Sequence, residues 1–165
     1  MFFYSTSKKI QHTNNLKLHS LAEAKNESWL KTAVSWAEDK WGYLRFFHPV
    51  KHKDFIQKNI ANFYILTYAN QPIGMFALSD YQNFSKHKWT DLSYFYVAKN
   101  FRGLGIGGTM FKMAKSIYDG KNSDSMIIET LTPALNRFYE KKGAKVVGER
   151  EPHDFNPFPA TIMRI

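Results

Sequence analysis

The chain has no cysteine, only six prolines and no long run of apolar residues. Without cysteine it can form no disulfide, no thiolate nucleophile and no cysteine-ligated zinc site. No segment approaches the roughly 20 apolar residues that a membrane-spanning helix requires. Residues 1–10 also lack the charged-then-apolar order of a secretory signal. We therefore expect a cytoplasmic protein with no membrane partner.

Charge of one sign is not concentrated anywhere, although the formal net charge is +9. A basic protein can bind nucleic acid by releasing counterions from its phosphates. Here the lysines are dispersed without a basic run, which disfavours a nucleic-acid partner, and a positive field suits an anionic cofactor equally well. His48 and His52 are four residues apart, but Pro49 lies between them and no third ligand is apparent. We expect no metal site.

The length of 165 residues suits a single domain, residues 1–165, in which residues 1–14 form a loose arm or an edge strand. Hydrophobic periodicity and turn residues predict the order of the elements. That order indicates an α+β (mixed α/β) domain around one largely antiparallel twisted sheet. The predicted elements are a strand from Leu16, a helix from Ser20 to Trp41, a helix with Pro49 in its first turn, strands 63–68, 73–78 and 92–98, a polar loop at 80–90, a helix at 109–118, a strand at 125–130, a helix near Leu135, and closing strands at 146–147 and 160–165.

A glycine-rich loop follows the strand predicted at 92–98. Gly103, Gly105, Gly107 and Gly108 carry no Cβ atoms, so a ligand can approach the main chain and positive φ values are tolerated. A helix expected to begin near Gly108 would add unpaired N–H groups and the positive end of its dipole. Arg102 adds a full charge. The loop is therefore predicted to hold a diphosphate.

Two other phosphate-binding interpretations fit less well. A Walker-type loop requires Lys-Ser or Lys-Thr after its last glycine, whereas Thr109 follows Gly108 directly. Gly103, Gly105 and Gly108 match the G-x-G-x-x-G spacing of dinucleotide-binding proteins, and Glu129 lies about 20 residues further on. However, the rest of the chain is too short for the remaining strands and helices of a doubly wound sheet.

The third interpretation rests on Arg102-x-x-Gly105-x-Gly107 and on the later segment Leu135 to Ala144, which is similar to a Phe-Tyr-Glu-Lys-x-Gly-Phe signature. With these motifs in the expected order, residues 62–165 resemble the GNAT superfamily of acetyl-CoA-dependent N-acetyltransferases. The stretch from Trp36 to Gly42 also resembles the first helix of some bacterial members. The resemblance implies a GNAT-type acyl-CoA N-acyltransferase fold with helices on both faces of the sheet. In that fold the fourth and fifth strands part at one end to admit the cofactor.

The resemblance further implies transfer of an acetyl group from acetyl-CoA, as co-substrate, to a primary amine by direct attack in a ternary complex. The chain has no cysteine that could form a covalent acyl-enzyme. The acceptor could be a small-molecule amine or a protein amino group, and a homodimer is left open. The alternative function is a non-catalytic acyl-CoA-binding sensor or interaction module that keeps the loop without turnover.

Three residues are candidates for the proton transfers. The resemblance assigns Tyr139 as the acid that protonates the departing thiolate, although Leu135, Phe138 and Tyr139 also share one helix face typical of a core. Glu129, near the end of its strand, is the first choice of general base and Asp91 is the second. A relay through water, with neither carboxylate essential, is the alternative.

The remaining site residues are assigned by the same resemblance. The N–H of Val97 is expected to stabilise the oxyanion. Thr132 stands where the family commonly has asparagine, and before Pro133 it is also suited to be a helix N-cap. Ala144 replaces the usual phenylalanine after Gly143. The predicted cofactor contacts are Tyr96, Val97, Arg102, Gly103, Leu104, Gly105, Ile106, Gly107, Gly108, Thr109 and Thr132, and the predicted acceptor contacts are Trp36, Trp41 and Tyr43.

Overall fold

The computed structural model describes residues 15–46, 51–152 and 158–165. Their seven strands form one sheet in the order β1-β2-β3-β4-β5-β7-β6, and every neighbouring pair is antiparallel except β4 and β5. The arm expected at residues 1–14 and the helix start expected at Pro49 lie outside the described residues. The strands are β1 (Leu16–Ser20), β2 (Phe63–Tyr68), β3 (Gln71–Gln82), β4 (Lys88–Val97), β5 (Ser125–Thr130), β6 (Lys145–Arg150) and β7 (Ala160–Arg164).

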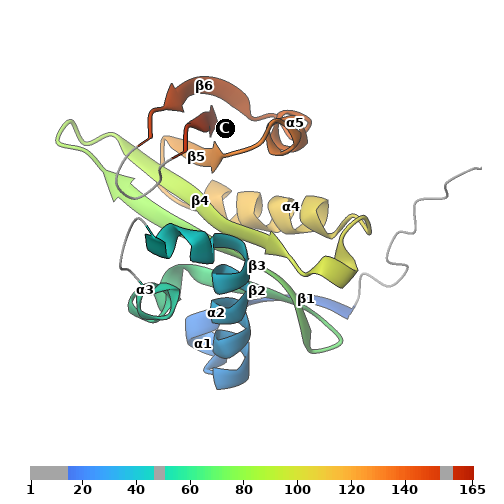
Figure 1. Ribbon diagram of the computed structural model, residues 1–165. Helices are drawn as coiled ribbons and strands as arrows, with labels where there is room; N and C mark the ends of the chain where they lie inside the picture. Colours follow the sequence, from blue (N-terminus) through green and yellow to red (C-terminus); the bar gives the residue numbers. More distant parts are fainter. Residues whose placement is uncertain (1–14, 47–50, 153–157) are drawn as a thin grey trace, which may run out of the picture.

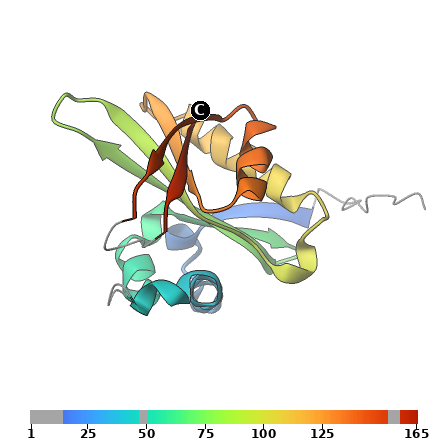
Figure 2. The same ribbon diagram turned by 45° about the horizontal axis from the view of Figure 1, so that its top comes forward.

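Helices cover both faces of this sheet (Figures 1 and 2). One apolar core, which includes Phe76, Met110 and Phe111, packs the sheet against α4 and α5. A second core, which includes Ala37 and Ile65, packs the opposite face against α1, α2 and α3. The predicted fold class is confirmed. The helices are α1 (Leu21–Ala24), α2 (Glu27–Trp41), α3 (His52–Lys58), α4 (Ile106–Asp119) and α5 (Pro133–Glu140), with 3₁₀ helices η2 (Gly42–Phe46), η3 (Ile60–Asn62) and η4 (Lys99–Phe101).

Two expected elements differ from the structure. The single helix predicted from Ser20 is interrupted at Lys25, where φ is 48°, and Asn26 starts a new helix by accepting a hydrogen bond from the N–H of Trp29. The polar loop predicted at 80–90 is mostly strand, because β3 continues to Gln82 and β4 begins at Lys88. This hairpin extends beyond the helices (Figure 1), so its polar residues can pair as strands while facing water. Among the described residues, no helix is both long and apolar enough to cross a membrane.

A β-bulge in β4 sets which side chains face which core. The register between β3 and β4 shifts by one residue, so that Tyr94 and Phe95 together oppose Phe76, and Tyr94 has a φ of 50°. As a result Leu92 and Phe95 pack with α4, whereas Tyr94 and Tyr96 pack with α2. In a regular strand Leu92, Tyr94 and Tyr96 would share one face. The bulge thus moves Tyr94 onto the α2 face.

The parallel pair of β4 and β5 is joined along only part of its length. Cα pairing runs from Trp89 with Ser125 to Leu92 with Ile128. Beyond this point β4 continues to Val97 and β5 continues to Thr130 without pairing to each other. We call the paired part the closed end and the unpaired part the open end. At the open end, β4 is still paired with β3, and β5 with β7. The main-chain groups on the two edges that face each other lack a sheet partner.

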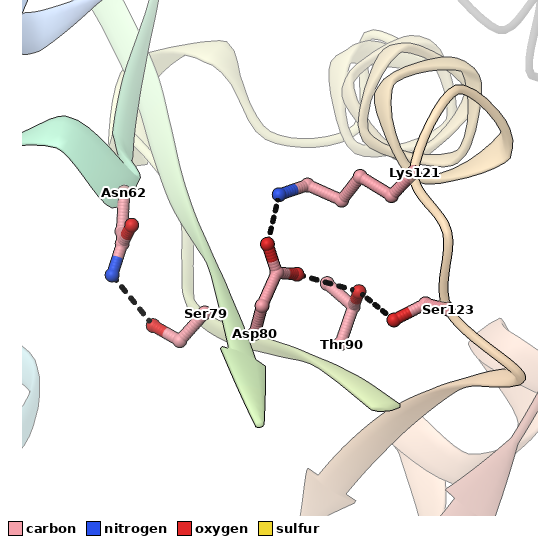
Figure 3. Close-up of polar contacts among 6 residues, drawn as sticks. All are labelled: Asn62, Ser79, Asp80, Thr90, Lys121 and Ser123. Atoms are coloured by element: carbon pink, nitrogen blue, oxygen red, sulfur yellow. Dashed lines mark hydrogen bonds and ion pairs between the residues drawn. The ribbon is translucent and has the colours of Figure 1, made fainter. Parts of the chain in front are cut away.

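A polar network ties the closed end together (Figure 3). The buried hydroxyl of Thr90 donates to Asp80 Oδ1 at 2.8 Å and shares a hydrogen bond of 2.9 Å with the hydroxyl of Ser123. Lys121 Nζ lies 2.6 Å from Asp80 Oδ2. These contacts join β3 and β4 to the segment that connects α4 to β5. They fix the start of the parallel pair and leave its other end free to diverge.

Candidate active site

A cavity of about 370 Å³ lies at the open end, between the diverging strands and the segment that connects α2 to α3. Asp91 and Phe95 of β4 line it, as does Glu129 of β5. Tyr139 of α5 closes one side, and Trp41 lies on the opposite wall. Groups from α2, η2, α3, β4, β5 and α5 therefore converge where β4 and β5 diverge.

The glycine-rich loop leads directly into α4. Gly105 is the N-cap residue, with a φ of 82°, and Gly103 has a φ of 76°. These two glycines thus adopt the positive φ that glycine permits. The helix was expected to begin near Gly108, but α4 begins at Ile106, so Gly107 and Gly108 lie in its first turn. The left-handed conformation of Gly105 ends the loop earlier than the glycine spacing suggested.

The loop and the first turn of α4 present a row of free N–H groups. The first helical hydrogen bond runs from the N–H of Thr109 to the carbonyl of Gly105, at 3.1 Å. Within the described ranges, no acceptor is found for the N–H groups of residues 103–108. A Cβ atom at Gly103 or Gly105 would meet nothing within 4 Å, so this main chain is open to a ligand. Such a row at a helix N-terminus suits a phosphate group.

Two cations lie beside these N–H groups. Arg102 Nε donates to the carbonyl of Val97 at 2.9 Å, and its guanidinium lies 5.2 Å from the ring centroid of Tyr96. Lys142 Nζ lies 4.1 Å from the ring centroid of Phe138 and 3.9 Å from the position of a Cβ on Gly108. The sequence analysis missed Lys142, because it occupies the variable position of the Phe-Tyr-Glu-Lys-x-Gly signature. Only the packing of α5 against α4 brings it to the loop.

The other predicted cofactor contacts divide into main-chain and side-chain groups. Ile106 and Tyr96 are buried in the two cores, so they offer a ligand their main chain rather than their side chains. The N–H of Ala98 donates to the carbonyl of Ile73 in β3, and successive N–H groups of a strand point to opposite edges. The N–H of Val97 therefore faces the open end. Leu104 packs against the α4 core.

Two predicted hydroxyl contacts lie at helix starts. The Thr109 hydroxyl donates to the carbonyl of Gly105 at 3.5 Å, within the first turn of α4. Thr132 is the N-cap residue of α5, as predicted, but its side chain makes no capping hydrogen bond and instead lines the cavity. Its hydroxyl is therefore placed to meet a ligand there.

Tyr139 is both a core residue and a cavity residue. It is only 3% exposed, and its ring lies 5.5 Å from that of Phe111 and 6.0 Å from that of Phe95. Among the described residues none hydrogen bonds its hydroxyl, and the residue lines the cavity. Burial raises the pKa of the Tyr139 phenol well above its ordinary value. The phenol is thus neutral near pH 7.

Asp91 and Glu129 lie together in the cavity wall. Asp91 pairs with Ile127 of β5, so Glu129, two residues further on, shares its face of the sheet. Burial, followed by the negative charge of Glu129, raises the pKa of Asp91 to about 6. Glu129 itself forms an ion pair with Arg150 of β6. Asp91, in contrast, has a side-chain hydrogen bond from Ser93, which lowers its pKa in part.

Aromatic side chains form the wall opposite the carboxylates. Trp41, Tyr43 and Tyr94 all line the cavity, whereas Trp36 stacks on Tyr96 at 5.4 Å outside its lining. His52 joins this wall from α3, with ring nitrogens 3.1 Å from the Tyr94 hydroxyl and 3.1 Å from the Trp41 carbonyl. Since a carbonyl only accepts, Nε2 of His52 donates to Trp41. Nowhere in the described ranges do three or more His, Asp or Glu side chains form a group that could hold a metal ion.

A family model described as "Acetyltransferase (GNAT) domain" matches residues 59–143, which include the glycine-rich loop, the β4–β5 pair and Tyr139. No curated protein matches the chain at a significant level. The sequence motifs and the family model thus agree on the same part of the chain.

Solved structures share the fold at low sequence identity. Arabidopsis thaliana Naa50, in complex with the bisubstrate analogue CoA-Ac-MVNAL, is 17% identical with a TM-score of 0.68, over 92% of this chain and 98% of that one. Ard1 from Thermoplasma volcanium is 18% identical with a TM-score of 0.66, over 92% and 97%. An aminoglycoside 6'-N-acetyltransferase complexed with coenzyme A is 11% identical with a TM-score of 0.69, over 90% and 96%.

Proposed function

Because this chain belongs to the acetyltransferase (GNAT) family, we propose that it is an N-acetyltransferase that transfers an acetyl group from acetyl-CoA to a primary amine. The amine attacks directly while both substrates are bound. The observation that carries the proposal is the row of free N–H groups at residues 103–108, which lies beside the open end of the β4–β5 pair.

The chain's own residues suit acetyl-CoA. The N–H groups of residues 103–108, with Arg102 and Lys142 beside them, match the charge and size of a diphosphate. The unpaired edges of β4 and β5 offer main-chain partners to an amide-containing arm. Complexes of fold relatives with coenzyme A or a CoA-linked analogue support this assignment.

Three groups supply the chemistry of direct transfer. Asp91 accepts a proton from the acceptor ammonium, so that the neutral amine can attack the thioester carbonyl carbon. The N–H of Val97 stabilises the negative charge that develops on the carbonyl oxygen. When the carbonyl re-forms and the carbon–sulfur bond breaks, Tyr139 donates its proton to the thiolate, and the surplus proton of the attacking nitrogen passes to the phenolate that is left. Thr132 lies at the same wall and is proposed to contact the cofactor arm.

We place Asp91 ahead of Glu129 as the general base, which reverses the order that the sequence favours. A base works best when its pKa is close to the operating pH, and burial together with Glu129 raises the pKa of Asp91 to about 6. The carboxylate of Glu129 is already paired with Arg150. Glu129 is therefore less free to take a proton.

The acceptor is proposed to bind between Trp41, Tyr43 and the two carboxylates. Aromatic faces and carboxylates together suit a cationic amine. Fold relatives include an enzyme crystallised with a peptide-bearing analogue and an aminoglycoside acetyltransferase, so both a protein amino group and a small-molecule amine are proposed acceptor classes.

The test combines binding and turnover. Calorimetry should detect binding of coenzyme A, and a panel of peptides, polyamines and aminoglycosides should reveal acetyl-CoA consumption. Tyr139→Phe should lose most turnover while keeping coenzyme binding, whereas Tyr118→Phe on α4, away from the cavity, should keep both. Binding without product for every acceptor would instead indicate an acyl-CoA sensor.

A further inference from the structure

A basic residue beside the two carboxylates of the cavity has no part in the proposed chemistry. Arg150, the last residue of β6, forms an ion pair with Glu129 although β7 lies between their strands. Arg150 pairs with Ala160 of β7, and Ile162, two residues further along β7, pairs with Glu129. All four side chains share one face of the sheet. The small Ala160 leaves room for Arg150 to reach Glu129.

The charges around Asp91 make this contact consequential. The charged or titratable groups that face the cavity with Asp91 are Lys40 of α2, His52 of α3 and Glu129, and Arg150 acts on it from β6. Glu129 and Arg150 act on Asp91 in opposite directions: the negative charge of Glu129 raises its pKa and the positive charge of Arg150 lowers it. Arg150 therefore offsets part of the effect of Glu129 on Asp91.

The phenols near Asp91 carry no charge near pH 7 that could change its pKa. Burial raises the pKa of the phenols of Tyr43, Tyr81, Tyr94 and Tyr139 above the ordinary value, so all four are neutral near pH 7. The balance of charge at Asp91 thus depends chiefly on Glu129 and its partner.

We infer that Arg150 is a positioning residue for acetyl transfer: by pairing with Glu129 it neutralises that carboxylate and leaves Asp91 able to accept the acceptor's proton. This inference rests on the proposed function, since it assigns a role in the same reaction. Arg150 touches neither substrate in this scheme. It holds the carboxylate of Glu129 in an ion pair and also lowers the pKa of Asp91 by its own charge.

The ion pair is not needed for folding. The side chains of Arg150 and Glu129 are 45% and 29% exposed, and pairs of this kind add little to stability. Arg150→Met should therefore fold normally, with a melting temperature close to that of the wild type. Lys115→Met is the matched control, because it breaks a comparable ion pair, with Asp119 on α4, away from the cavity.

The pH–rate profile distinguishes this role from a structural one. In Arg150→Met, the charge of Glu129 acts on Asp91 without compensation, so the acidic limb should move up by about one pH unit. The rate near pH 6 should fall about fivefold, and most of it should return above pH 8. Arg150→Lys should restore most of the wild-type profile, and Lys115→Met should not change it. An equal loss of rate at every pH would overturn the inference.

A double-mutant cycle tests whether Arg150 acts through Glu129. In the Glu129→Gln background, Arg150→Met should still move the acidic limb up, because Arg150 also acts on Asp91 by its own charge, but by less than in the wild type, because the carboxylate that Arg150 pairs with is gone. An undiminished shift would show that the ion pair with Glu129 plays no part and would contradict the inference.

Carboxyl ¹³C NMR titration of Asp91 provides a readout that needs no turnover. The midpoint should rise by about one pH unit in Arg150→Met, whether or not an acceptor has been identified. If the wild type acetylates no amine, the proposed function fails while this electrostatic role is still measured. An unchanged midpoint, with turnover intact, would overturn the role of Arg150 and leave the proposed function standing.

Discussion

The two ends of the β4–β5 pair are built from the same two strands but differ in almost every respect. At the closed end the strands pair, and Thr90, Asp80 and Ser123 satisfy one another's polar groups. At the open end the strands diverge around a cavity, and the N–H groups of residues 103–108 have no acceptor in the described structure. Asp91 lies in the paired part, just before the strands diverge, and lines this cavity, where burial raises its pKa to about 6. We infer that the closed end contributes stability and the open end contributes chemistry.

The largest expected effect is in the cavity, at Asp91. Asp91→Asn should lower kcat at neutral pH by about 1,000-fold, within the range for loss of a general base, and should leave coenzyme A affinity unchanged. Steady-state kinetics with calorimetry would check this. Asp119→Asn, on the exposed surface of α4, serves as the control. Equal losses of kcat and of coenzyme affinity would argue that Asp91 is structural.

The glycine-rich loop should give the next largest effect. Gly105 has a φ of 82°, which aspartate tolerates better than most residues, so Gly105→Asp should fold. Its carboxylate would repel phosphate and weaken coenzyme A binding about 100-fold, measured by calorimetry. Gly120→Asp, at the other end of α4, should bind normally. Retained affinity in Gly105→Asp would mean that the phosphates bind elsewhere.

Stability should respond to Asp91 in the opposite sense to activity. The folded-state pKa of about 6 lies above the ordinary value of 3.8, so the folded protein holds the proton more tightly than the unfolded chain. Wild-type stability should therefore fall as the pH rises from about 4 to 6. Asp91→Asn should be more stable than the wild type by about 3 kcal/mol at pH 8, with the difference vanishing below pH 4. Urea unfolding at both pH values would measure it, and a pH-independent difference would contradict it.

A substitution at the closed end should lower stability rather than activity, and by a smaller amount. Thr90→Val removes a buried hydroxyl and leaves Asp80 with Lys121 as its remaining partner, so it should cost about 1.5 kcal/mol of unfolding free energy. Coenzyme affinity should hardly change and kcat should stay within about twofold. A large loss of coenzyme binding with unchanged stability would remove the distinction between the two ends.

Local sequence patterns predicted the parts of the site that depend on one segment. The glycines of residues 103–108 and the surroundings of Tyr139 lie in short motifs, and the strand–loop–helix order follows from hydrophobic periodicity. The family model confirms the family that these motifs indicated. The start of α4 was misplaced because four glycines in six residues do not reveal which one adopts the left-handed conformation.

Features that depend on distant pairing could not be predicted in this way. The bulge at Tyr94 arises from the register between β3 and β4, and the ion pair of Arg150 crosses an intervening strand. Lys142 reaches the loop only through helix packing. The segment at 80–90 looked like a loop because polar residues in an exposed hairpin leave no apolar alternation.

The most direct test of the account follows the backbone amides by NMR while coenzyme A is added. The account predicts large shifts and slowed hydrogen exchange at residues 103–108 and at Val97, with little change at Thr90 and Ser123. An absence of binding, or changes confined to the closed end, would contradict the claim that the open end receives the coenzyme.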